Sequence, residues 1–121
     1  AEWGLAWDLK STRDPRPEAF GRQARQLGYH IQAAWYLRGC AAVGLPADEF
    51  AFLAIRNVLP TRCAVFRVPE SVMARGREDM LGAFTRYRRA VETGSWPGYG
   101  DELKELQWPR WDLKKENNDE W

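Results

Sequence analysis

An aspartate and a lysine stand two residues apart, at Asp8 and Lys10, in a segment that alternates between apolar and polar residues. If this segment is a β-strand, the two side chains point the same way and lie about 6.6 Å apart along it. A carboxylate is a suitable ligand for Mg²⁺ or Mn²⁺, and a neighbouring ammonium can stabilise charge on a phosphate or help to activate water. A surface strand with one acid and one base has the same triplet, so the triplet alone does not decide between the two interpretations.

A second pair of polar residues, Gln32 and Tyr36, lies in a segment with helical periodicity. Residues four apart share one face of a helix. An amide and a phenol on that face can hydrogen-bond a phosphate or an attacking water, and the phenol ring can stack on a base or a sugar. The same residues also fit an ordinary half-buried amphipathic face, and that alternative stays open.

The periodicity predicts the elements that must position these side chains. Residues 4–11 alternate as a strand, with Leu5, Trp7 and Leu9 on the core face and the acid and the lysine on the other face. We expect the remaining elements to be helices at 17–27 and 29–43, a hairpin of strands at 50–58 and 62–68, and a helix at 71–94. Ser71 is the expected N-cap of that last helix. The order β-α-α-β-β-α predicts an α/β or α+β domain.

Most of the large apolar side chains are expected to be structural. One stripe on the long helix is formed by Met73, Met80, Phe84, Tyr87 and Val91. Beyond that helix the sequence is rich in proline and glycine, so we expect an irregular tail. Its tryptophans are expected to pin it onto the body of the domain, at Trp96, Trp108 and Trp111.

The bulk composition fits one globular domain: 121 residues, of which 45% are hydrophobic and 29% charged. No apolar run approaches 18 residues, so no membrane span is expected. Cys40 and Cys63 are interpreted as small buried hydrophobes of a reducing compartment, which predicts a cytoplasmic protein. Two cysteines this far apart also exclude a four-cysteine zinc or iron–sulfur site.

The net charge of +1 combines a mildly basic body with acidic residues after position 100, which is compatible with a polyanionic partner. Four arginines follow the first strand and either track a phosphate backbone or form a solvated helix face; they are Arg13, Arg16, Arg22 and Arg25. His30 is interpreted as a structural histidine.

Five motifs in order resemble the PD-(D/E)XK nuclease superfamily, especially its exonuclease VIII (RecE-like) and phage-type branch. They are WDLKST at 7–12, YHIQAAWY at 29–36, FAFLAI at 50–55, ETGSWPGY at 92–99 and LQWPRW at 106–111. The resemblance implies a restriction-endonuclease-like fold with a central mixed sheet flanked by helices. It assigns residues 1–111 to the C-terminal part of the nuclease domain and leaves 112–121 as a charged tail, which we expect to be flexible.

The resemblance also implies a role for each matching residue. Asp8 and the carbonyl of Leu9 would bind Mg²⁺ or Mn²⁺, and Lys10 and Gln32 would be catalytic. Further candidates for contact with DNA are Ser11, Thr12, Arg13, Tyr29 and Tyr36.

The family carries another aspartate on a preceding strand, and this branch adds a histidine and a glutamate from upstream helices. Only Glu2 precedes Asp8 as an acid here, and in a continuing strand it would lie about 20 Å away, too far to share a cation. We therefore expect the chain to be a fragment of a longer nuclease and to be inactive or nearly so by itself.

By resemblance, the full enzyme would be a Mg²⁺-dependent 5′→3′ exonuclease on double-stranded DNA, in phage-type recombination with a strand-annealing partner. Relatives form rings, so a homo-oligomer is expected. Two alternatives stay open. One is a catalytically inactive nuclease fold that acts as a DNA-binding or assembly module, and the other is an endonuclease or a single-strand-specific nuclease of the same superfamily.

Overall fold

Three strands form one mixed sheet in the computed structural model, which describes residues 4–113. Strands β1 (Leu5–Thr12), β2 (Glu49–Arg56) and β3 (Cys63–Arg67) lie in the order β1-β2-β3. The first two are parallel, and β2 and β3 form the predicted antiparallel hairpin. A parallel pair requires a long crossover, which two helices supply. The predicted mixed sheet is therefore confirmed.

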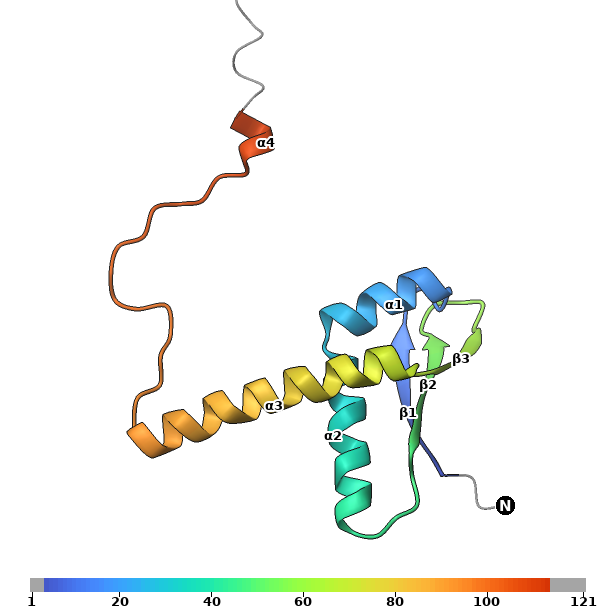
Figure 1. The fold of residues 1–121 in the computed structure, drawn as a ribbon. Helices are drawn as coiled ribbons and strands as arrows, with labels where there is room; N and C mark the ends of the chain where they lie inside the picture. The colour runs from blue at the N-terminus through green and yellow to red at the C-terminus, as the bar shows by residue number, and fades with distance from the viewer. Residues whose placement is uncertain (1–3, 114–121) are drawn as a thin grey trace, which may run out of the picture.

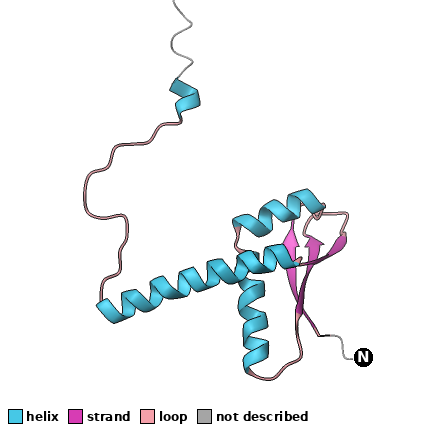
Figure 2. Cartoon of the chain, viewed as in Figure 1, coloured by secondary structure: helices cyan, strands magenta, loops and turns pink. Residues whose placement is uncertain are grey.

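The crossover consists of α1 (Pro17–Gln26) and α2 (Tyr29–Ala42), and the hairpin leads into the long helix α3 (Glu70–Thr93). Figures 1 and 2 show these three helices on one side of the sheet. A fourth, short helix, α4 (Arg110–Leu113), lies in the tail. The expected N-cap of α3 is wrong, because Pro69 takes that position and Ser71 lies inside the helix. No helix within residues 4–113 is both long and apolar enough to cross a membrane.

The helices cover the side of the sheet on which β1 carries the acid and the lysine. Buried aromatic and small side chains from β2 and the helices form the core beneath them; they are Phe20, Ala33, Ala34, Phe50, Phe52, Ala54, Met73 and Met80. The prediction that Leu5, Trp7 and Leu9 face the core is wrong, since Trp7 is 63% exposed and Leu5 and Leu9 are exposed as well. The alternation of residues separates the two faces of β1 correctly, but the helices cover the face with Asp8 and Lys10 and not the apolar face.

The outer face of the sheet is consequently apolar and open among the described residues. Leu9 of β1, Leu53 of β2 and Val65 of β3 are in register across it. Leu9 and Val65 are exposed and Leu53 is partly buried. Cys63 is also exposed and Cys40 is only half-buried, so the prediction that both cysteines are core residues is wrong.

The apolar stripe of α3 is buried only along its first half. Met73 and Met80 are buried, whereas Phe84, Tyr87 and Val91 are exposed. Figure 1 shows the reason, because the second half of α3 extends beyond the sheet and the other helices.

The tail tryptophans are more exposed than expected. Trp96 contacts the ring of Tyr87 on α3, with centroids 5.8 Å apart, yet it remains exposed. Trp108 and Trp111 are exposed as well. The expected anchoring of the tail on the body is seen at Trp96, which contacts α3.

Helices α2 and α3 cross closely at Gly76, which is buried. A Cβ atom built there would lie 2.1 Å from the carbonyl oxygen of His30 and 3.3 Å from the Cβ of Ala34. The crossing therefore requires a residue without a side chain. It holds the start of α2 against α3, and the start of α2 also carries Gln32.

We predict that Gly76→Ala lowers the free energy of unfolding by about 1–3 kcal/mol, because two backbones must separate to admit the methyl group. Gly39→Ala on α2 is the matched control, since a Cβ there meets nothing within 4 Å. Helix propensity should make the control more stable, by up to about 1 kcal/mol. Chemical denaturation of both variants measures the difference. Equal effects of the two substitutions would show that the helices do not cross as described.

Candidate active site

Asp8 and Lys10 lie side by side on the helix-covered side of β1. The ammonium Nζ of Lys10 is 2.8 Å from Oδ2 of Asp8. The side chain of Lys10 is 19% exposed and that of Asp8 is 31% exposed, so both remain accessible at the rim of the core. The alternation in the sequence predicts this shared orientation, and the structure has it.

Gln32 reaches the same carboxylate from the neighbouring helix. Its Nε2 donates a hydrogen bond of 2.9 Å to Oδ2 of Asp8. The position of Gln32 on the first turn of α2 places the amide over β1, and the crossing at Gly76 fixes that turn. An acid, an amine and an amide from two elements thus converge on one point.

The pKa of Asp8 is lowered from its ordinary value. The hydrogen bond from Lys10 is the main cause; burial opposes it, and the hydrogen bond from Gln32 and the charge of Lys10 add to it. The carboxylate is therefore ionised at neutral pH, as a metal ligand must be.

Two aromatic rings border the lysine. The ring centroid of Tyr29 lies 4.5 Å from Nζ of Lys10, and that of Phe52 lies 6.0 Å away. Both distances are within the range of cation–π attraction. Lys10 thus has a carboxylate and the face of Tyr29 as neighbours. The sequence suggested Tyr29 as a residue in contact with DNA, but the structure places its ring against the lysine.

Sequence reasoning missed Gln23 of α1, which links three elements near the site. Its amide bonds to the hydroxyl of Tyr29, to the carbonyl of Ser11 and to the hydroxyl of Thr12. One signal was available: Gln23 follows Phe20 by three residues and precedes Leu27 by four, so it interrupts an apolar helix stripe with a polar side chain.

The other four candidates for contact with DNA differ in their exposure. Thr12 is 4% exposed and its hydroxyl is bonded within the protein, which corrects its assignment as a DNA-facing residue. Ser11, Arg13 and Tyr36 are exposed. The ring of Tyr36 packs on Phe50, with centroids 6.1 Å apart. The role of the Leu9 carbonyl as a metal ligand stays a prediction.

His30 belongs to a separate cluster. Its Nε2 lies 2.9 Å from Oδ2 of Asp79, which Arg75 also contacts. The histidine thus links α2 to α3, in line with a structural role. The His30 and Arg75 side chains lower the pKa of Asp79, and the hydrogen bond from His30 is the larger cause.

A cavity lies beside that cluster rather than at the acid and the lysine. It has a volume of about 650 Å³ and is bordered by α1, β3 and the first turns of α3. Phe20, Phe66 and Val72 give it an apolar lining, and His30 and Asp79 also line it. Asp8, Lys10 and Gln32 do not line it.

The described residues supply only part of a metal site. Residues 4–113 contain no group of three or more histidine, cysteine, aspartate or glutamate side chains placed to hold one ion. Asp8 is a suitable single ligand, but Mg²⁺ needs more oxygen ligands than one carboxylate and one carbonyl. Glu2, the sole acid before Asp8, lies outside the described residues.

Comparisons with known proteins place this geometry in context. Residues 1–107 match the model of the family described as "PDDEXK-like domain of unknown function (DUF3799)". No protein of curated function matches the chain.

A crystal structure from Eubacterium rectale, of a protein provisionally described as an exonuclease, has a similar fold, with a TM-score of 0.61 and 17% sequence identity. The match covers 91% of this chain and 47% of the other, so the chain spans about half the length of that relative. At this identity the likeness shows the fold alone, an α+β arrangement of the restriction-endonuclease-like kind.

The pKa of Asp8 offers a test of the site. In metal-free buffer, Lys10→Met should raise the pKa of the Asp8 carboxyl more than Gln32→Leu does, because the lysine is the larger cause of its depression. Carboxyl ¹³C NMR titration measures both. A carboxyl with a depressed folded pKa stabilises the protein above its unfolded pKa, and that contribution is lost as the pH falls through the folded value.

The pKa of Asp79 is the internal control, since neither substituted residue is among the causes of its depression. A pKa of Asp8 that stays the same in both variants would contradict the contacts described here.

Proposed function

Because the chain belongs to the family of PDDEXK-like domains, we propose that the protein is a metal-dependent DNA nuclease whose active site contains Asp8, Lys10 and Gln32. The observation that carries this proposal is the carboxylate of Asp8, held at once by Lys10 from the same strand and by Gln32 from α2. Such a group of an ionised acid and a protonated amine suits chemistry on a phosphodiester.

Each side chain has a distinct part in the proposed reaction. Asp8 and the carbonyl of Leu9 would hold a divalent ion, Mg²⁺ or Mn²⁺, which when bound supplies Lewis-acid chemistry at the phosphate. Lys10 stabilises the negative charge that develops on the phosphate oxygens. The amide of Gln32 orients the Asp8 carboxylate and is within reach of a substrate oxygen or water at the same point.

The remaining metal ligands are proposed to come from residues outside 4–113. Two observations support this. The chain spans 47% of the Eubacterium rectale protein. The outer face of the sheet is also apolar and exposed at Leu5, Trp7 and Leu9, and patches of this kind mark surfaces where further protein packs. We propose that the rest of the protein covers this face and also extends past β1, which is the edge strand of the described sheet, so that further acids reach Asp8 on the covered side.

The finer assignment rests on the sequence motifs that resemble exonuclease VIII. On that basis the protein is a cytoplasmic 5′→3′ exonuclease on double-stranded DNA. It acts in phage-type recombination, with a strand-annealing protein as partner and a ring as its assembled form. Arg13, just after β1, and Arg22 on α1 are exposed basic residues that suit contact with the phosphate backbone.

One observation favours a second candidate function, an inactive nuclease fold that binds DNA or serves in assembly. Among residues 4–113, the acid–lysine site contains one carboxylate and no cluster of metal-binding side chains. If the rest of the protein lacks further acids near Asp8, the same surface would bind DNA without cutting it.

We predict that Asp8→Asn and Lys10→Ala each slow Mg²⁺-dependent digestion of linear double-stranded DNA by the whole protein by about 100-fold or more. Asp101→Asn and Lys104→Ala are matched controls, because they make the same changes at exposed tail positions. Unchanged digestion in both site variants would overturn the assignment. DNA binding without digestion by the unmodified protein would favour the second candidate.

A further inference from the structure

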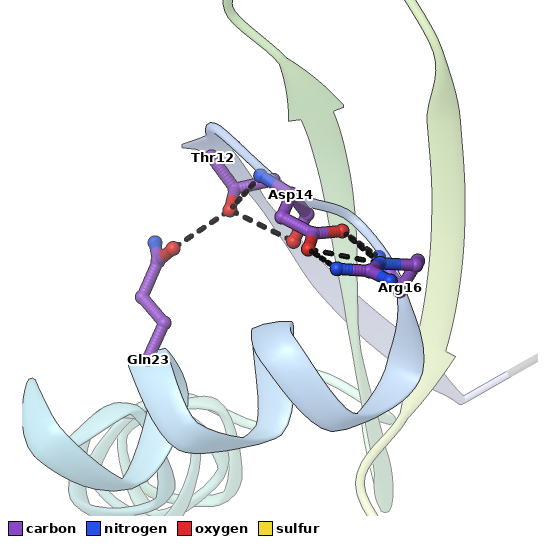
Figure 3. Close-up of polar contacts among 4 residues, drawn as sticks. All are labelled: Thr12, Asp14, Arg16 and Gln23. Atoms are coloured by element: carbon purple, nitrogen blue, oxygen red, sulfur yellow. Dashed lines mark hydrogen bonds and ion pairs between the residues drawn. The ribbon is translucent and has the colours of Figure 1, made fainter.

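The end of β1 carries a buried polar residue just beyond the lysine. Thr12 is the one polar or charged residue that is buried among those described, and it lies two positions after Lys10 on the same side of the strand. A buried hydroxyl needs a hydrogen-bond partner. Its Oγ1 donates to Oε1 of Gln23 over 2.7 Å and also contacts the backbone of Asp14 (Figure 3).

The amide of Gln23 makes hydrogen bonds to three neighbours. Besides accepting from Thr12, its Nε2 donates to the carbonyl of Ser11 and to the hydroxyl of Tyr29, each over 3.1 Å. Figure 3 shows the Gln23 side chain reaching from α1 toward the end of β1. One side chain therefore ties together the strand that carries the lysine, the first helix and the start of the second.

The third of these contacts leads back to the lysine. The ring centroid of Tyr29 lies 4.5 Å from Nζ of Lys10. The same centroid lies 5.4 Å from the ring centroid of Phe52 and 6.0 Å from that of Phe20. The two phenylalanines fix the ring from the core side, and Gln23 fixes its hydroxyl. Lysine has a flexible four-carbon stem, so the ring face and the Asp8 carboxylate restrict where the ammonium can lie.

We propose that Gln23 and Tyr29 are positioning residues for Lys10. Gln23 holds the Tyr29 ring and the end of β1, and the ring holds the ammonium beside Asp8. Gln23 acts through Tyr29 and the strand, without touching the substrate. This inference rests on the proposed nuclease function for its effect on rate, but the positioning itself is a property of the folded protein and can be measured separately.

As a positioning residue, Tyr29 has a role different from stacking on DNA. A ring that packs on Lys10, Phe20 and Phe52 has little face left for a base. Loss of Tyr29 should therefore lower kcat through misplacement of the ammonium and leave KM for DNA nearly unchanged. Loss of a residue that binds DNA would instead raise KM.

The kinetic test uses the whole protein and four variants. Tyr29→Leu removes the ring and should lower kcat by about 10- to 100-fold. Tyr29→Phe keeps the ring and should restore most of that loss. Gln23→Leu should resemble Tyr29→Phe in its effect through the ring, with an added loss from the freed end of β1. Gln26→Leu is the matched control, because Gln26 is an exposed glutamine on the same helix.

A double-mutant cycle separates positioning from general loss of stability. In a Lys10→Ala background, Tyr29→Leu should cause no further loss of kcat, because the group that it positions is absent. An equal loss with and without the lysine would overturn the proposal, and so would a raised KM with unchanged kcat.

An NMR measurement tests the same proposal without any nuclease activity. In the whole protein with ¹³C-labelled lysine, the ε-methylene of Lys10 should show a ring-current shift that identifies the overlying aromatic face. The shift should persist in Tyr29→Phe, weaken in Gln23→Leu and fall in Tyr29→Leu to the smaller contribution of the more distant Phe52 ring. If the protein cleaves no DNA but the shifts follow this order, the positioning stands and the nuclease function falls. If the shifts are insensitive to Tyr29, the positioning falls.

Discussion

Three polar side chains of one strand lie on the side of the sheet that the helices cover, and the rest of the structure depends on supplying their hydrogen-bond partners. Asp8, Lys10 and Thr12 share the covered side of β1, where an unpaired polar group would be costly. Partners come from the strand itself and from α1 and α2. No buried side-chain nitrogen or oxygen among the described residues lacks a hydrogen-bond partner. The same contacts that make the polar side tolerable also fix the geometry of the candidate site.

The two crossover helices have complementary parts in this arrangement. Gln32 of α2 holds the carboxylate directly, whereas Gln23 of α1 holds the strand end and the aromatic ring over the amine. The angle of α2 is in turn set by its contact with α3, where Gly76 admits the carbonyl of His30. The contact between α2 and α3 lies outside the site, yet it determines where the amide of Gln32 lies. Packing of the helices is thus linked to the chemistry proposed for the site.

The covered and the open faces of the sheet are built on different principles. The covered face mixes aromatic side chains with polar groups that need partners, and the open face presents Leu5, Trp7 and Leu9. Exposed apolar side chains are costly in water. We therefore propose that the remainder of the protein packs on this face. The site lies on β1, at the edge of the described sheet, where residues from such a remainder could join Asp8.

The sequence by itself determined the strand that bears Asp8 and Lys10, the helix that bears Gln32 and the order of strands and helices along the chain. It could do so because periods of two and of 3.6 residues are local properties of the chain. Those periods also placed the acid and the lysine on one side. They could not decide which side the helices cover, so the prediction that Trp7 faces the core is wrong. They also could not join Gln23 to Thr12 and Tyr29. Only the tertiary structure decided these points, because burial and hydrogen bonding between elements depend on how helices and sheet pack together, and not on the spacing of residues within any one of them.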